Sequence, residues 1–186
     1  FIPLGYKRGF WDGYNGPSPL DIHVSERNYV WSFAGAPRSK ERQDTIQLFV
    51  DKFSPHHLHW EHGNSFSDPK TGLSTEDFRG ILLNSKFGLC PIGISKTRSG
   101  ETGRIGEVLE TGGIPIVLSG DNDHKEPYWF SLYGRDPPFV VGQTWDECVE
   151  QVQELLDNPT KCEDVRQRCW YFWKGVKKDV TNKLFC

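Results

Sequence analysis

The sequence RIGEVLETGGIPIVL (residues 104–118) joins a short helix to a buried strand, and this junction sets the fold class. Its first half carries apolar residues at helical spacing, namely Ile105, Val108 and Leu109. Gly112 and Gly113 then end the helix. The run IPIVL (residues 114–118) that follows predicts a strand. Because Pro115 has no N–H for a sheet hydrogen bond, we expect it at a strand start or in an edge strand.

The same alternation of helix and strand continues on both sides of this stretch. Short apolar runs predict further strands at 29–34, 56–60, 87–92 and 139–141. Helical spacing and N-cap residues predict helices at 39–53, 74–83, 144–158 and 161–183. Thr144 and Glu147 fit a capping box at one of these helix starts. Such alternation favours parallel pairing with right-handed crossovers. We therefore predict a Rossmann-like open parallel sheet with helices on both faces and the carboxyl-terminal helix packing across it.

Composition excludes several classes of protein. The 186 residues are 36% hydrophobic and 25% charged, as in a globular domain and unlike a disordered or coiled-coil chain. The net charge is −3 and no basic tract is present, so we expect no nucleic-acid partner. No apolar run approaches the roughly 20 residues of a membrane helix. Since the chain begins at Phe1 and contains no Met, we expect a fragment or processed piece whose targeting segment or membrane anchor lies upstream.

We expect three segments along the chain. Residues 1–27 are rich in Gly and Pro and predict an entering linker with short extended pieces. Residues 28–160 carry the alternating pattern, and residues 161–186 form the carboxyl-terminal helix. That helix contains the aromatic row WYFW (residues 170–173), which predicts burial on more than one side. Packing in the core and packing against a further domain both fit this row.

The five cysteines leave the redox state open; they are Cys90, Cys148, Cys162, Cys169 and Cys186. None forms a CxxC pair, so a structural zinc site is not expected. One disulfide among the carboxyl-terminal cysteines and a set of buried free thiols both fit the spacing.

The strongest chemical signal is SKTRSGETGRIGE (residues 95–107), a loop that leads into a helix after a strand. In a parallel sheet such a loop lies at the carboxyl ends of the strands, where ligands bind. A helix amino terminus with nearby cationic side chains suits a phosphate. The candidate residues are Ser95, Lys96, Arg98, Thr102, Gly103, Arg104 and Glu107. Arg104 and Glu107 share one helix face, so one can bind a diphosphate while the other accepts from ribose hydroxyls. A solvated loop with an intrahelical Arg–Glu pair is the alternative.

Two other groups of polar residues fit metal or ligand contacts less well. Asp121 and Asp123 follow a strand and could bind a divalent cation, but a solvated acidic turn is the leading interpretation. The histidines around the second strand could contact zinc or a ligand, or simply pack; they are His56, His57, His59 and His62. No downstream residue has metal-ligand spacing to them, and we expect no essential metal or other cofactor.

Three motifs in order resemble the exostosin-type glycosyltransferases. They are NSKFGLCPIG (residues 84–93), RIGE (residues 104–107) and GGIPIVLS (residues 112–119). The similarity extends over about 29–141. Within that family the chain is most similar to the xylosyltransferases that extend ribitol phosphate. It departs from the family pattern at Val108 and Gly113, where Ala and Cys are usual, and it lacks a run of several arginines before Arg104.

The resemblance implies one half of a GT-B fold: the carboxyl-terminal, donor-binding half of an inverting glycosyltransferase. The implied partners are a UDP-sugar donor, a glycan or alditol-phosphate acceptor, and an amino-terminal GT-B domain absent from this chain. The implied location is the Golgi lumen, with any membrane contact through an anchor outside this chain. A non-catalytic module that binds a nucleotide or phosphosugar is the alternative.

The resemblance also assigns roles to residues. Arg104 matches the family arginine that neutralises the diphosphate, and Glu107 would contact the ribose or the donor sugar. Glu107 is also the candidate catalytic residue in this chain, although the base is otherwise expected from the absent half. Gly35, after the first strand, would let the backbone approach the phosphates. Arg42, together with Arg38, would assist or else lie exposed on the surface.

Overall fold

The computed structural model describes residues 10–35, 39–60, 73–91, 104–119, 133–134 and 136–185. These residues contain one sheet of five parallel strands in the order β2-β1-β3-β4-β5. The strands are β1 (Tyr29–Gly35), β2 (His56–Trp60), β3 (Ser85–Leu89), β4 (Ile114–Leu118) and β5 (Val140–Gly142). The predicted Rossmann-like parallel sheet is therefore confirmed.

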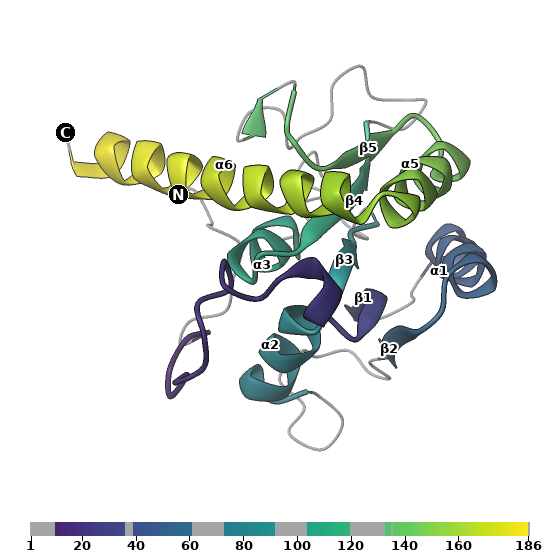
Figure 1. The fold of residues 1–186 in the computed structure, drawn as a ribbon, viewed down its shortest axis with the longest axis horizontal. Helices are drawn as coiled ribbons and strands as arrows, with labels where there is room; N and C mark the ends of the chain where they lie inside the picture. Colours follow the sequence, from purple (N-terminus) through teal and green to yellow (C-terminus); the bar gives the residue numbers. More distant parts are fainter. Residues whose placement is uncertain are drawn as a thin grey trace.

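Helices cover both faces of the sheet (Figure 1). On one side, α1 (Lys40–Lys52) and α5 (Trp145–Asp157) contact each other, and α5 packs on β4 and β5. On the other side, α2 (Thr75–Leu83) packs on β1 and β3, and α3 (Arg104–Glu110) packs on β3 and β4. The last helix, α6 (Pro159–Phe185), starts beside α5, contacts β4 and runs on to α3. This confirms that the carboxyl-terminal helix packs across the domain.

Three strand details differ from the sequence expectation. β3 begins at Ser85, two residues early, and β5 begins at Val140, one residue late. Of the two positions expected for Pro115, the edge strand is wrong, because β4 lies between β3 and β5, whereas the strand start is confirmed, because Pro115 is the second residue of β4. β5 pairs with β4 only from Ile116 onward. Pro115 therefore needs no N–H toward β5, and its ring is tolerated near the strand start.

Glycines fix the position of α3 on the sheet. A Cβ on Gly88 of β3 would lie 2.2 Å from Val108 Cγ2, so only glycine lets Val108 pack directly on this strand. At the other end of α3, the Gly112 N–H donates to Leu109 O and the Gly113 N–H donates to Val108 O. With Gly112 at φ +67°, this pair of bonds is a Schellman motif, which ends the helix as predicted.

N-cap residues start the helices where the sequence indicates. Ser39, Ser74 and Thr144 each accept a hydrogen bond from the backbone N–H three residues on. The capping box at α5 is displaced by one residue, because the Glu147 carboxylate accepts from the Gln143 N–H, 2.7 Å away, and not from Thr144. Asn158 accepts from the Lys161 N–H, and α6 then begins at Pro159, where a missing N–H is harmless.

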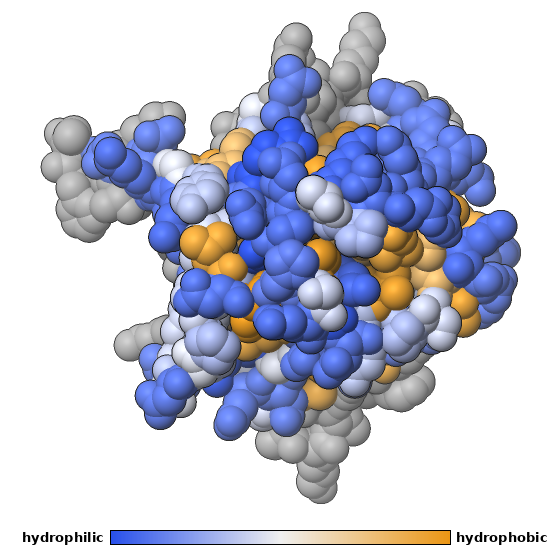
Figure 2. Space-filling model, in the orientation of Figure 1, coloured by the Kyte–Doolittle hydropathy of each residue, from blue (hydrophilic) through white to orange (hydrophobic). Residues whose placement is uncertain are grey.

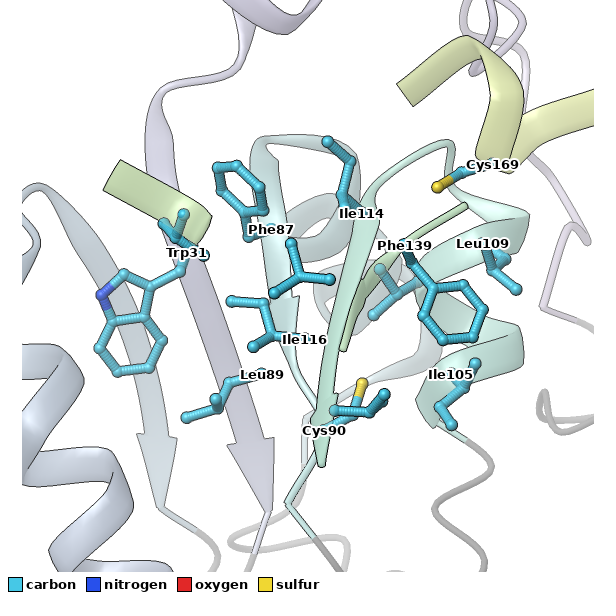
Figure 3. Packing of buried hydrophobic residues seen from close by; sticks show 14 of the residues in the cluster. Trp31, Phe87, Leu89, Cys90, Ile105, Leu109, Ile114, Ile116, Phe139 and Cys169 are labelled. Carbon is cyan, nitrogen blue, oxygen red and sulfur yellow. The ribbon is translucent and has the colours of Figure 1, made fainter. Parts of the chain in front are cut away.

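The hydrophobic core lies between the sheet and both helix layers. Figure 3 shows core residues from the strands, among them Trp31, Phe87, Leu89 and Ile116, together with Ile105 and Leu109 of α3. Burial of such side chains is the main favourable term in folding.

On the surface seen in Figure 2, hydrophilic residues dominate and hydrophobic atoms show between them. No helix within the described ranges is both long enough and apolar enough to span a membrane.

The described part of the segment predicted as a linker, residues 10–27, packs closely on the core. Phe10 and Val24 are buried there, and so is the Arg27 guanidinium. Arg27 Nη1 donates to Ser85 O at 3.0 Å, and its Nη2 donates to Thr111 O at 2.9 Å. These carbonyls lie at the start of β3 and just before β4, so Arg27 joins the segment to the amino-terminal ends of the strands. The division of the chain into three segments stays a prediction.

Two buried carboxylates hold α6 to the same end of the sheet. Glu163 forms two hydrogen bonds with Arg166, at 2.6 and 2.8 Å, and accepts from the Val24 N–H at 3.0 Å. Burial by itself raises the pKa of Glu163, but these hydrogen bonds outweigh it and lower the pKa to about 2. Glu110 of α3 accepts hydrogen bonds from its neighbours Trp11, Trp173 and Lys177.

Cysteines and the aromatic row of α6 complete the interior. Among the described cysteines no disulfide forms; Cys90, Cys148, Cys162 and Cys169 are all buried free thiols. Burial raises the pKa of Cys148 to about 12 and that of Cys162 to about 11, so both thiols stay protonated and unreactive. Trp170 and Trp173 are buried, whereas Tyr171 is 60% exposed, so the aromatic row faces both core and surface. Cys186 lies outside the described residues.

Candidate functional site

The candidate site lies at the carboxyl end of β1. In the strand order β2-β1-β3, the chain leaves β1 in one direction to β2 and returns past β1 to β3. This reversal is a topological switch point, and ligands of open α/β sheets bind beyond the strand ends at such points. Gly35 is the last residue of β1 and therefore stands at this position.

Arg104 reaches this point from α3, where it is the first helical residue. Its Cζ lies 4.6 Å from the centre of the Phe33 ring, which is within cation–π distance. A Cβ built on Gly35 would lie 2.9 Å from Arg104 Nη2. The side chain is half-buried, and its Nε is buried without a hydrogen-bond partner. Within the described part of the chain, Arg104 makes no ion pair or hydrogen bond, so its N–H groups are available there to a ligand.

Arg42 approaches the same aromatic ring from α1 on the other face of the sheet. Its Cζ lies 6.0 Å from the centre of the Phe33 ring. The backbone N–H of Arg42 donates to Ser39 Oγ at 3.2 Å, which places Arg42 in the first turn of α1. Three residues chosen from sequence, Gly35, Arg42 and Arg104, are thus brought together around one ring.

Glu107 follows Arg104 by one helical turn and is buried, at 9% exposure. Its main-chain carbonyl accepts from the Thr111 N–H and hydroxyl.

Several sequence candidates lie outside the described residues. These are Ser95, Lys96, Arg98, Thr102 and Gly103 of the loop before α3, together with Arg38, His62, Asp121 and Asp123. Of the described histidines, His56 stacks on Trp31 with ring centres 5.3 Å apart, and the His57 ring meets Tyr29 at 5.2 Å. No group of three or more metal-ligating side chains occurs in the ranges that the structure describes.

Phe33 is the site residue that sequence reasoning missed. The run YVWSFA predicts only a buried strand there, and Phe33 is 2% exposed. The sequence signal that could have identified Phe33 is its position two residues before the glycine that ends β1. An aromatic ring at that point can support cationic side chains that arrive from two helices.

Comparison with known families identifies the family of the chain. The model of the RXYLT1 C-terminal domain matches residues 16–185, which is nearly the whole chain. The chain belongs to this family. The RXYLT1 C-terminal domain is related to glycosyltransferases, which confirms the family resemblance and its similarity to ribitol-phosphate xylosyltransferases. No curated protein matches the chain.

Proposed function

We propose that this chain is the donor-binding half of an inverting glycosyltransferase that uses a UDP-sugar. The acceptor is a glycan or an alditol phosphate. The observation that carries the proposal is the Arg104 guanidinium at the end of β1, stacked on Phe33 with no hydrogen-bond partner among the described residues. The match to the RXYLT1 C-terminal domain supports the class of reaction.

The chemistry of sugar transfer explains why an arginine belongs here. As the bond between the sugar and UDP breaks, the diphosphate gains negative charge. A cation held at that position stabilises the transition state more than the ground state. A guanidinium also forms two parallel hydrogen bonds to phosphate oxygens. Arg42, 6.0 Å from the same ring, adds a second positive charge for the same anion.

The rest of the proposed enzyme lies outside this chain. An amino-terminal GT-B domain closes the cleft, binds the acceptor and supplies the remaining catalytic groups. The reaction needs no essential metal ion, because the arginines neutralise the leaving diphosphate. The proposed location is the Golgi lumen, reached through a segment outside these residues.

The direct test is UDP binding by calorimetry on the protein at its full natural length. Arg104→Ala is expected to weaken binding by about 1.5–3 kcal/mol, roughly 10- to 150-fold, because a charge-assisted hydrogen bond is lost. Arg168→Ala is the matched control, since Arg168 is an exposed arginine of α6 paired with Asp164 and should leave affinity unchanged. A folded Arg104→Ala protein that binds UDP as tightly as wild type contradicts the proposal.

Glu107→Gln separates the two roles proposed for this carboxylate. If Glu107 takes the acceptor proton, kcat falls by about 100- to 10,000-fold while the Kd for UDP is unchanged. If Glu107 accepts from the ribose hydroxyls, the Kd for UDP rises and kcat changes less. Full activity together with unchanged UDP affinity would remove Glu107 from the site. UDP binding by a protein with no transferase activity on any acceptor would favour the non-catalytic module.

A further inference from the structure

We propose that Phe33 and Gly35 are positioning residues that hold the Arg104 guanidinium ready for the diphosphate before the donor arrives. This inference rests on the proposed function and adds an account of how the Arg104 guanidinium is held in place. It concerns two residues of β1 that carry no polar side chain and act through the side chain of Arg104.

The Phe33 ring is a rigid support. It is 2% exposed and belongs to the main hydrophobic cluster, so it is packed on all sides in the core. The Arg104 Cζ lies 4.6 Å from the ring centre, which is within the range of cation–π attraction. Stacking uses the face of the guanidinium and leaves its N–H donors, which point outward in the guanidinium plane, available to an anion.

Gly35 supplies the space that this stacking needs. A Cβ at residue 35 would lie 2.9 Å from Arg104 Nη2, 3.4 Å from Nη1 and 3.3 Å from Phe33 Cζ. Any side chain there must therefore displace the guanidinium, the ring or both. The missing side chain and the aromatic ring together form one seat for Arg104, which we call the arginine seat.

The arginine seat should strengthen UDP binding, because a side chain that is already ordered in the free protein loses less conformational entropy on binding. An arginine side chain loses considerable rotamer freedom when it binds a ligand, unless it is already held in place. Arg42 reaches the same ring from α1, with its Cζ 6.0 Å from the ring centre. The seat thus favours the diphosphate-bound state without contacting the diphosphate itself.

The test is UDP affinity of Phe33→Leu and Gly35→Ala, each in the wild-type and in the Arg104→Ala background, at full natural length. Each single change is expected to weaken UDP binding by about 3- to 10-fold in wild type. Neither should weaken it further when Arg104 is already absent, because both act through that side chain. Phe87→Leu is the matched control; this phenylalanine is fully buried in β3, so the change should lower stability and leave UDP affinity unchanged.

Wild-type UDP affinity in Phe33→Leu and Gly35→Ala overturns the inference, and so does an equal loss in both backgrounds. Thermal unfolding separates this result from failure of the proposed function. Gly35→Ala should lower the Tm by about 2–4 °C more in wild type than in Arg104→Ala, since only wild type has the displaced guanidinium. If wild type does not bind UDP yet this difference in Tm is found, the proposed function fails and the arginine seat stands. If the Tm losses are equal, the seat itself is absent.

Discussion

Arginines stand at both ends of this parallel sheet, and their surroundings differ. At the amino-terminal end, Arg27 donates to four carbonyl oxygens and Arg166 forms two bonds with Glu163. At the carboxyl-terminal end, Arg104 stacks on Phe33 and has no hydrogen-bond partner within the described residues. Both Arg27 and Arg104 have an Nε without a hydrogen-bond partner, but the Nη atoms of Arg27 are bonded to carbonyl oxygens, whereas those of Arg104 have no partner among the described residues.

The difference separates structural arginines from a candidate ligand-binding arginine. A buried guanidinium whose donors are satisfied by carbonyls joins segments that are distant in sequence, as Arg27 joins β1 to β3 and β4. A guanidinium fixed by stacking alone is held in place without losing its donors. Residue type alone does not distinguish the two cases, whereas the partners do.

The largest expected effect is a loss of stability at the amino-terminal end of the sheet, where the arginines are structural. Arg166→Ala removes the partner of a buried carboxylate and should lower the free energy of unfolding by about 3–5 kcal/mol. Urea denaturation measures this loss, and UDP affinity of the folded fraction should stay at the wild-type value. The double variant Arg166→Leu with Glu163→Leu should recover most of the stability, because no unpaired charge is then buried. A loss below 1 kcal/mol for Arg166→Ala would mean that this end is not structural.

A smaller loss of stability is expected where α3 packs on β3, and α3 also carries Arg104 at the carboxyl-terminal end of the sheet. Gly88→Ala forces Val108 away from β3 and should cost about 1–3 kcal/mol of stability, because the core there is already filled. Since Arg104 begins the same helix, UDP affinity should fall as well. Gly80→Ala in α2 is the matched control: no atom lies within 4 Å of its new Cβ, so stability should rise slightly. Wild-type stability in Gly88→Ala would contradict the close packing of α3 on the sheet.

A further effect is a dependence of stability on pH, which arises at the amino-terminal end of the sheet. The pKa of Glu163 is about 2 in the folded protein against an ordinary 4.5, so its stabilising contribution is complete above about pH 4.5. The contribution is lost as the pH falls from about 4.5 to about 2, because the unfolded chain binds the proton first. Acid denaturation should therefore be shallower in this range for Glu163→Gln. Identical acid profiles for the variant and wild type would show that the carboxylate is not stabilised there.

The sequence predicts the sheet and its helices well because local signals agree with the tertiary contacts. Ser39, Ser74 and Thr144 cap the helices that they were expected to cap, and Gly112 and Gly113 end α3. The interior position of Pro115 was not predictable, because it depends on where β5 starts to pair. The packing of residues 10–27 was also missed, since a segment without periodicity can still be held by long-range contacts of Arg27 and Glu110.

The candidate site is predictable in part. Gly35, Arg42 and Arg104 could be chosen because parallel topology brings strand ends and helix starts together. The stacking on Phe33 could not, because it depends on how side chains from α1 and α3 meet across a strand end. The remaining loop candidates, from Ser95 to Gly103, stay predictions.

The measurement that tests the central claim most directly is a crystal structure of the full-length protein with UDP bound. We predict that the diphosphate lies beyond the end of β1 and that its oxygens are about 2.7–2.9 Å from the Arg104 guanidinium nitrogens, as in charge-assisted hydrogen bonds. The guanidinium should still rest on the Phe33 ring. A diphosphate bound at another place, with Arg104 paired to a carboxylate of the protein, would contradict the account.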